Sequence, residues 1–294
     1  MRDQAWRLRM MVEEKVVPVR GRARVIAVTS GKGGVGKTNI SVGLALAAAA
    51  SGLRTVLLDG DLGLANIDVL LDLHPKRNLG HLIDGRATLD EVLINAPGGI
   101  KVLPGASGLT NVADLGLLQK QRLLDAVGRL VEEFDLVLID TGAGISRAVL
   151  DLCVCAGEVL VVTTPEPTAI VDAYAMLKVF SKEENAPRNW LVVNQVLSRG
   201  EAQQVSSRMI GLAHQFLGHE IRDCGAIFQD PRVSAAVRKR QHFSLSYPSC
   251  PAARGVRDLA RNLGLSRRQG SKGFLQRIKV LWSGDLSRAH ERSV

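Results

Sequence analysis

The stretch that decides the fold is a glycine-rich loop, Ser30-Gly31-Lys32-Gly33-Gly34-Val35-Gly36-Lys37-Thr38. Its residues 31–38 fit the pattern Gly-x-x-x-x-Gly-Lys-Ser/Thr. The apolar residues 24–29 precede the loop as a predicted strand, and residues 39–50, rich in small side chains, follow it as a predicted helix. A strand, a glycine loop and a helix in this order present backbone N–H groups and a helix N-terminus to phosphate.

Each part of the loop can be given a role in binding a nucleoside triphosphate. We expect the backbone to surround the β-phosphate, Lys37 to reach the β- and γ-phosphates, and the Thr38 hydroxyl to bind Mg²⁺. The predicted nucleotide-binding residues are Gly31, Lys32, Gly33, Gly34, Val35, Gly36, Lys37, Thr38 and Asn39. Lys32 is a second lysine that the pattern does not require. It is either a solvated loop residue or a charge aimed at a phosphate, including that of a partner subunit.

Beyond the loop, apolar strands alternate with helices. Strands are predicted at residues 54–59, 100–103, 134–140, 158–163 and 189–194, and helices at 115–133 and 168–180. This alternation predicts an α/β fold with three layers, in which helices cover both faces of a mostly parallel, twisted sheet. Further helices are expected at 203–217, 233–240 and 252–263, with Asp230-Pro231 as a break.

Three aspartates stand where predicted strands end. Asp59 and Asp140 each close a strand, and Asp61 follows two residues after Asp59. Ligands of parallel sheets bind beyond the carboxyl ends of the strands. We therefore expect one of these carboxylates to hold the water shell of Mg²⁺ and another to orient the attacking water. Gly142 and Gly144 would let the loop after Asp140 respond to the γ-phosphate.

Composition narrows the class of protein. The chain has 294 residues, of which 46% are hydrophobic and 23% charged. No apolar run reaches the roughly 18 residues of a transmembrane helix, and the charged N-terminus lacks the apolar core of a signal peptide. We therefore expect a cytoplasmic protein. Its four cysteines fit no zinc spacing and are predicted to be buried thiols.

The positive charge lies in the two tails. Residues 1–24 hold seven Lys and Arg against three acidic residues, and residues 254–294 hold ten against three. Residues 25–253 hold 21 against 23. A basic face for DNA across the body is therefore not indicated, and we expect no specific nucleic-acid binding. The basic tails favour contacts with an anionic membrane surface or with acidic partners.

We divide the chain into three parts: a partner-docking segment and linker (1–22), a nucleotide-binding ATPase domain (23–265), and a basic linker followed by an amphipathic helix (266–294). The N-terminal segment would either dock a partner or pack on the body. The C-terminal helix gathers apolar side chains on one face, namely Phe274, Leu275, Ile278, Leu281 and Trp282. Such a face, flanked by Arg277 and Lys279, fits a helix lying on an anionic membrane. The alternative is a helix docked on the core.

These motifs together resemble a known family. The lysine inside the loop, Lys32, resembles the deviant Walker loop of the MinD/ParA ATPases, which are P-loop NTPases. Within that group, residues 59–71, 140–145, 164–174 and 232–248 resemble the flagellar-number regulators of the FlhG/FleN (YlxH) type. The N-terminal Asp3-Gln4-Ala5-x-x-Leu8-Arg9 resembles their docking sequence for the flagellar switch complex.

The resemblance implies roles residue by residue. Lys32 would cross a dimer interface to the partner's nucleotide, and Asp61 would position the attacking water. The implied catalytic residues are Lys32, Lys37 and Asp61. The implied Mg²⁺ site holds Thr38, Asp59 and Asp140. The implied dimer interface holds Lys32, Asn66 and Asp172. Asn194 resembles the residue that reads adenine. Gly60 stands where the family more usually has alanine.

The function that the resemblance implies is that of a Mg²⁺-dependent ATPase switch. ATP would drive homodimerisation and free the C-terminal helix for the inner face of the cell membrane. Slow, partner-stimulated hydrolysis would reverse both steps. The output would be control of flagellar number, placement and gene expression. Implied partners are an FlhF-type GTPase, the flagellar switch (C-ring) proteins and a flagellar transcription activator.

Two other functions stay open at this point. One is a MinD/ParA-type positioning or DNA-partition ATPase; the slightly acidic body disfavours the DNA binding that partition requires. The other is a mainly non-catalytic, ATP-dependent repressor of a transcription activator. An iron–sulfur carrier of the same superfamily would need a cysteine after the Asp140 loop, but residues 146–148 are Ser, Arg and Ala.

Overall fold

The structure is a computed structural model that describes residues 23–61, 66–105, 115–266, 274 and 277–278. The predicted N-terminal docking segment and linker, residues 1–22, lie outside the described residues. So do several predicted docking and membrane residues, namely Asp3, Gln4, Ala5, Leu8, Arg9, Leu275, Leu281 and Trp282. The three-part division of the chain stays a prediction.

The centre of the fold is an eight-stranded sheet in the order β3-β4-β2-β5-β1-β6-β7-β8. Its strands are β1 (Arg24–Ser30), β2 (Thr55–Gly60), β3 (Ile94–Asn95), β4 (Lys101–Leu103), β5 (Leu136–Ala143), β6 (Glu158–Thr163), β7 (Arg188–Val196) and β8 (Ile221–Phe228). All neighbours run parallel except β3 and β4. The predicted mostly parallel sheet is confirmed.

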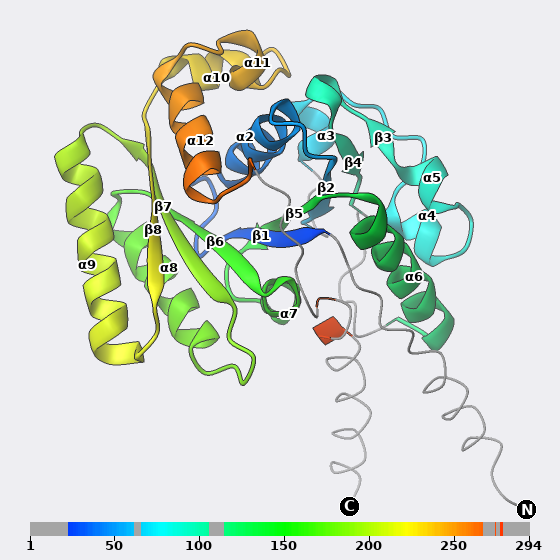
Figure 1. The fold of residues 1–294 in the computed structure, drawn as a ribbon, viewed down its shortest axis with the longest axis horizontal. Helices are drawn as coiled ribbons and strands as arrows, with labels where there is room; N and C mark the ends of the chain where they lie inside the picture. Colours follow the sequence, from blue (N-terminus) through cyan, green and yellow to red (C-terminus); the bar gives the residue numbers. More distant parts are fainter. Residues whose placement is uncertain (1–22, 62–65, 106–114, 267–273, 275–276, 279–294) are drawn as a thin grey trace, which may run out of the picture.

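Helices cover both faces of this sheet (Figure 1). One buried cluster joins it to α2 (Lys37–Ala50), α3 (Ile67–Leu70), α10 (Pro231–Val237), α11 (Phe243–Ser246) and α12 (Pro251–Asn262). The other joins it mainly to α4 (Leu79–Ile83), α5 (Leu89–Val92), α6 (Leu117–Glu133), α7 (Arg147–Ala156), α8 (Pro167–Phe180) and α9 (Arg199–Leu217). A short 3₁₀ helix, η1 (Pro97–Gly99), precedes β4. The three-layer prediction is therefore confirmed.

The central strands are apolar on both sides because both sides are covered. In β1, Val25 and Ala27 belong to one buried cluster, while Ile26 and Val28 belong to the other. Side chains that alternate in direction along a strand produce this division. A strand buried on two faces reads as a continuous apolar run, which is why these strands could be recognised in the sequence.

Two larger elements were not predicted. The edge strand β8 pairs with β7 alone and exposes Arg222 and Asp223, so it lacks a continuous apolar run. Helix α7 follows directly on the loop after β5 and buries Cys153 and Cys155 together. All four cysteines are buried and free, as predicted. Burial raises the pKa of the Cys153 thiol to about 12, so it stays protonated near neutral pH.

The C-terminal helix is docked where the structure describes it. Phe274 and Ile278, predicted to face a membrane, are only 5% and 9% exposed and belong to the cluster that also buries Cys153. Arg277 donates to the carbonyl oxygens of Cys155 and Ala156 at the end of α7, over 3.1 and 3.2 Å. The docked alternative therefore holds for these residues in this state. Within the part of the chain that the structure describes, no helix is long and apolar enough to cross a bilayer.

Candidate nucleotide site

The glycine loop connects β1 to α2 and is open toward solvent. Gly34 and Gly36 have φ angles of 81° and 89°, which side chains other than glycine rarely tolerate. No heavy atom lies within 4 Å of the place where a Cβ of Gly33 or Gly34 would stand. The backbone is thus accessible at Gly33 and Gly34, as phosphate binding requires, whereas Asn194 Nδ2 lies 2.4 Å from where a Cβ of Gly36 would stand.

Two neighbouring elements hold this loop in place. A Cβ on Gly31 would stand 2.3 Å from the backbone carbon of Asp172 in α8, so only glycine fits there. The side-chain amide of Asn194, at the end of β7, donates to the carbonyl oxygen of Val35 over 2.7 Å. Asn194 therefore fastens the loop in this state. Its predicted contact with adenine, and the interface role of Asp172, stay predictions.

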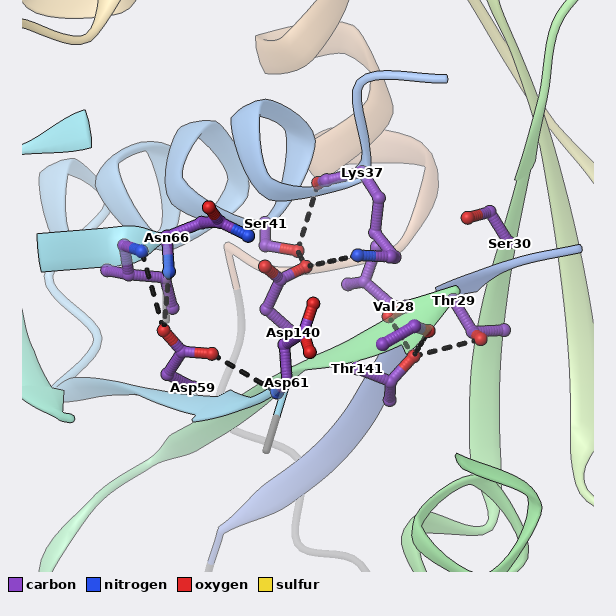
Figure 2. Close-up of polar contacts among 12 residues, drawn as sticks. Val28, Thr29, Ser30, Lys37, Ser41, Asp59, Asp61, Asn66, Asp140 and Thr141 are labelled. Carbon is purple, nitrogen blue, oxygen red and sulfur yellow. Dashed lines mark hydrogen bonds and ion pairs between the residues drawn. The ribbon is translucent and has the colours of Figure 1, made fainter. Parts of the chain in front are cut away.

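The sheet register brings the predicted metal-site carboxylates together. Asp59 of β2 and Asp140 of β5 are direct partners in the parallel ladder. Figure 2 shows Asp140 directed toward the first turns of α2, with Asp59 and Asp61 beside it. Asp140 accepts a hydrogen bond from Ser41 Oγ over 2.8 Å and lies 3.7 Å from Lys37 Nζ. One cation and two buried carboxylates thus meet at the loop.

The buried carboxylates carry more negative charge than the lysine balances. Burial raises the pKa of Asp140, and the ammonium of Lys37 opposes that rise. Burial and the neighbouring charge of Asp140 raise the pKa of Asp59 to about 7, although backbone N–H groups oppose the change. A divalent cation would neutralise this excess charge.

Asp59 also shapes the segment that follows β2. Its carboxylate accepts from the backbone N–H groups of Asp61, Asn66 and Ile67, over 3.2, 3.1 and 3.4 Å. Asp61 in turn approaches the C-terminal end of β5, with Oδ1 3.7 Å from where a Cβ of Gly142 would stand. The predicted water-positioning carboxylate thus lies beside the end of the strand that carries Asp140.

Lys32 is held within its own subunit. Its Nζ lies 2.5 Å from Oε1 of Glu166 and 2.8 Å from Oγ1 of Thr168, at the start of α8. Sequence reasoning missed both partners, and it missed Ser41. Two of these residues could have been found from their positions in the sequence. Glu166 follows shortly after the carboxyl end of β6, and Ser41 lies one helical turn after Lys37.

The residues fit a Mg²⁺-nucleotide. No group of three metal-ligating side chains occurs among the described residues, and Mg²⁺ bound to phosphates needs only one or two protein ligands besides water. Thr38 and Asp140 supply a hydroxyl and a carboxylate that hydrogen-bond to each other. The buried Oδ1 of Asn39 has no hydrogen-bond partner in the described part of the chain, so a polar ligand group could satisfy it.

The comparisons agree with this geometry. Residues 26–243 match the model of the CobQ/CobB/MinD/ParA nucleotide binding domain. The chain is 40% identical to the antiactivator FleN of Pseudomonas aeruginosa, over 82% of this chain and 86% of that protein. It is 31% identical to the flagellum site-determining protein YlxH of Helicobacter pylori, over 88% and 90%. The septum site-determining protein MinD of Pyrococcus horikoshii, solved with Mg-ADP, superposes with a TM-score of 0.67 at 22% identity, over 84% and 100%.

Proposed function

Because the chain belongs to the CobQ/CobB/MinD/ParA nucleotide-binding family, we propose that it is a Mg²⁺-dependent ATPase switch that controls flagellar number and placement. The observation that carries the proposal is the position of Lys32, a second lysine within a complete phosphate loop, in a chain that also has three aspartates at strand ends. The similarity to FleN and YlxH supports the flagellar part of the proposal.

The residues of the loop would bind and orient the triphosphate. The loop N–H groups and Lys37 hold the β- and γ-phosphates, while Thr38, Asp59 and Asp140 hold the metal and its water shell. The metal supplies positive charge where negative charge develops on the phosphate oxygens. Asp61 orients the attacking water. Hydrolysis is slow in a single subunit because Lys32 is then paired with Glu166 instead of a phosphate.

Dimerisation would place each Lys32 in the site of the other subunit. In the proposed dimer the interface would also contain Asn66, Asp172 and two apolar side chains, Ile145 and Val171, which are 52% and 65% exposed. A second copy would cover this apolar surface. ATP would favour the dimer because the partner's Lys32 gains a phosphate contact that ADP does not offer.

The C-terminal helix would bind the cytoplasmic face of the membrane when it leaves the body. Phe274 and Ile278 are buried against the cluster that contains α7, and α7 begins at Arg147, a few residues after Asp140. A shift of the loop after β5 would therefore move α7, and with it the surface against which Phe274 and Ile278 pack. Release exposes an apolar face beside basic residues, which suits an anionic bilayer. Membrane association is then reversible.

The partners follow from the relatives and the tails. The segment Asp3-Gln4-Ala5-x-x-Leu8-Arg9 would dock flagellar switch proteins, and an FlhF-type GTPase would be a further partner. The name antiactivator, given to FleN, favours a flagellar transcription activator as a further partner. It also favours a second candidate function, in which the ATP-bound form represses that activator and hydrolysis only ends the repression.

An Asp61→Ala variant tests the proposed function. We expect it to bind ATP and form a dimer but to lose phosphate release, because the attacking water is no longer oriented. In cells that express this variant in place of the wild type, the protein should stay in the dimeric state, so flagellar number should differ from that of wild-type cells. Wild-type hydrolysis by the variant contradicts the assigned role of Asp61. Normal flagellar number in cells that carry a hydrolysis-dead variant favours the non-catalytic candidate.

A further inference from the structure

The balanced charge of the body hides one strongly basic surface. Residues 231–263 hold seven Lys and Arg against one acidic residue. All seven are exposed: Arg232, Arg238, Lys239, Arg240, Arg254, Arg257 and Arg261. The same segment forms α10, α11 and α12, which lie together over α2 on one side of the sheet (Figure 1). The fold therefore brings these cations together on one surface, although the net charge counted over residues 25–253 is close to zero.

Most of this charge is not neutralised by nearby carboxylates. Arg254 and Arg257 donate to the carbonyl oxygens of Ser249 and Pro248, contacts that leave their charge in place. Arg238 and Lys239 make no ion pair with any residue that the structure describes. Arg232, Arg240 and Arg261 do pair with carboxylates. Four exposed cations are thus available to an anionic partner.

A cavity of about 470 Å³ adjoins this surface, because Lys239 and Arg240 are among the residues that line it. Leu71, Pro97 and Leu245 give it apolar walls, and Lys239 and Arg240 stand at it. Leu245 is 42% exposed although it is a large apolar side chain. We call the cavity and the two cations the basic cleft.

The basic cleft is held open by the fold. Asp72 and Arg240 both have a φ of 52°, unusual for residues with side chains, and they pair with each other over 3.2 Å. The fully buried His242, which also lines the cavity, bonds through Nε2 to the carbonyl oxygen of Asn39 in α2, over 2.8 Å. Anchored on both sides, the cleft does not need to form on binding, which favours a preorganised binding site.

We propose that the basic cleft docks an acidic segment of a partner protein, which places an apolar side chain between Leu71, Pro97 and Leu245 and carboxylates against Lys239 of the cleft and against Arg238, the preceding residue in the chain. The charge is complementary to such a segment, and the cavity has room for an apolar side chain and its neighbours. A nucleic-acid duplex would engage the cations but leave the apolar walls unused. A membrane takes apolar side chains that project outward, whereas these line a hollow.

This docking surface is separate from the surface on which the C-terminal residues Phe274 and Ile278 pack. The α10–α12 segment belongs to one buried cluster of the sheet, while Phe274 and Ile278 belong to the other. A partner in the basic cleft and a bilayer at the tail would therefore approach different faces of the molecule. The inference goes beyond the proposed ATPase switch and is tested on nucleotide-free, full-length protein, so the failure of one does not imply the failure of the other.

The probe is the fluorescein-labelled peptide Glu-Asp-Glu-Leu-Asp-Glu, and its counterpart with Ser in place of Leu is the control ligand. Fluorescence anisotropy should show the Leu peptide binding about tenfold more tightly, because only Leu buries apolar surface. Binding should weaken as salt rises from about 50 to 200 mM. A Leu245→Ser variant should bind both peptides equally.

Charge reversal locates the site. The double variant Arg238→Glu/Lys239→Glu should lose about tenfold or more in affinity for the Leu peptide. The control Lys182→Glu/Arg199→Glu makes the same change in net charge at two exposed cations elsewhere and should change affinity less than about twofold. If the reversed variant fails to fold by circular dichroism, Arg238→Gln/Lys239→Gln replaces it, with about threefold loss expected.

Three results would overturn the proposal. One is equal affinity of the wild type for the Leu and Ser peptides. Another is an equal loss of binding in the control double variant, which would reduce the effect to net charge. The third concerns a duplex of about 20 base pairs or anionic phosphatidylglycerol vesicles. If the wild type binds the duplex or the vesicles and Arg238→Glu/Lys239→Glu does not, while the wild type shows no preference for the Leu peptide over the Ser peptide, the surface binds phosphate groups and not an acidic protein segment.

Discussion

Lys32 and Glu166 form an ion pair within one subunit, with 2.5 Å between Nζ and Oε1, although 134 residues separate them in the chain. The pair joins the phosphate loop to the start of α8. One ammonium group cannot remain in this contact and also reach the nucleotide of a partner. The intramolecular pair therefore competes with the dimer, and both states are set by the same lysine.

Removing the carboxylate of Glu166 should favour the dimer. In Glu166→Gln the charge of Lys32 loses its partner, so ATP should drive dimerisation at a lower protein concentration. The pair is exposed to solvent and therefore weak, so we expect a shift of at most about fivefold. Analytical ultracentrifugation with a non-hydrolysable ATP analogue measures it. Glu184→Gln, an exposed change elsewhere, is the control; an unchanged or weaker dimer in Glu166→Gln refutes the competition.

Ser41 should affect the affinity for the metal. Its fully buried hydroxyl donates to Asp140, so Ser41→Ala leaves that carboxylate without one of its orienting bonds. We expect the Mg²⁺ concentration needed for tight ATP-analogue binding to rise about tenfold. Ser206→Ala removes another buried hydroxyl, one that bonds only a backbone carbonyl in α9, and should leave it unchanged. Equal Mg²⁺ titrations for both variants would contradict the assignment.

Asp59 should make the stability of the nucleotide-free protein pH-dependent. Its pKa is about 7 in the folded state, whereas the ordinary value for an aspartate is 3.8. Between these values the folded protein binds more protons, so its stability falls as pH rises from about 4 to 7 and levels off above. Relative to Asp59→Asn, the wild type should lose on the order of 2 kcal/mol between about pH 5 and pH 8. Denaturant unfolding measures the difference, and a constant difference at both pH values rules the effect out.

Arg277 should hold the C-terminal helix on α7. In Arg277→Gln the bonds to Cys155 and Ala156 are weakened, so the tail should leave the body more readily. We expect more cosedimentation with anionic liposomes in the absence of ATP. Arg188→Gln is the matched control, because the backbone N–H of Arg188 bonds Gly157 nearby while its side chain makes only a long ion pair with Glu158. Liposome binding equal to that of the wild type argues against a latch at α7.

The part of the fold that could be predicted is the part that local pattern dictates. The buried strands β1, β2, β5, β6 and β7 are apolar runs, and the glycine loop follows the first of them. Their parallel order then brings Asp59 and Asp140 side by side. The edge strand β8 was missed because one paired side and exposed polar residues leave no such run.

The rest of the site depends on contacts between distant segments. Nothing near Lys32 in the chain indicates Glu166, and nothing in residues 274–278 shows whether they face a membrane or α7. Amphipathic helices of both kinds carry the same pattern. The charge of α10–α12 was likewise hidden, because a count over residues 25–253 averages it with acidic segments elsewhere. The folded structure is needed to find the partner of Lys32, the surface that Phe274 and Ile278 contact, and the basic surface of α10–α12.

The most direct test of the account is the oligomeric state of Lys32→Ala with Mg²⁺ and a non-hydrolysable ATP analogue, measured by light scattering after gel filtration. Lys37 and the loop backbone remain, so the variant should bind the analogue about as tightly as the wild type does. It should nevertheless elute as a monomer, while the wild type elutes as a dimer. A Lys32→Ala dimer of wild-type strength would contradict the claim that this lysine links the nucleotide to the dimer.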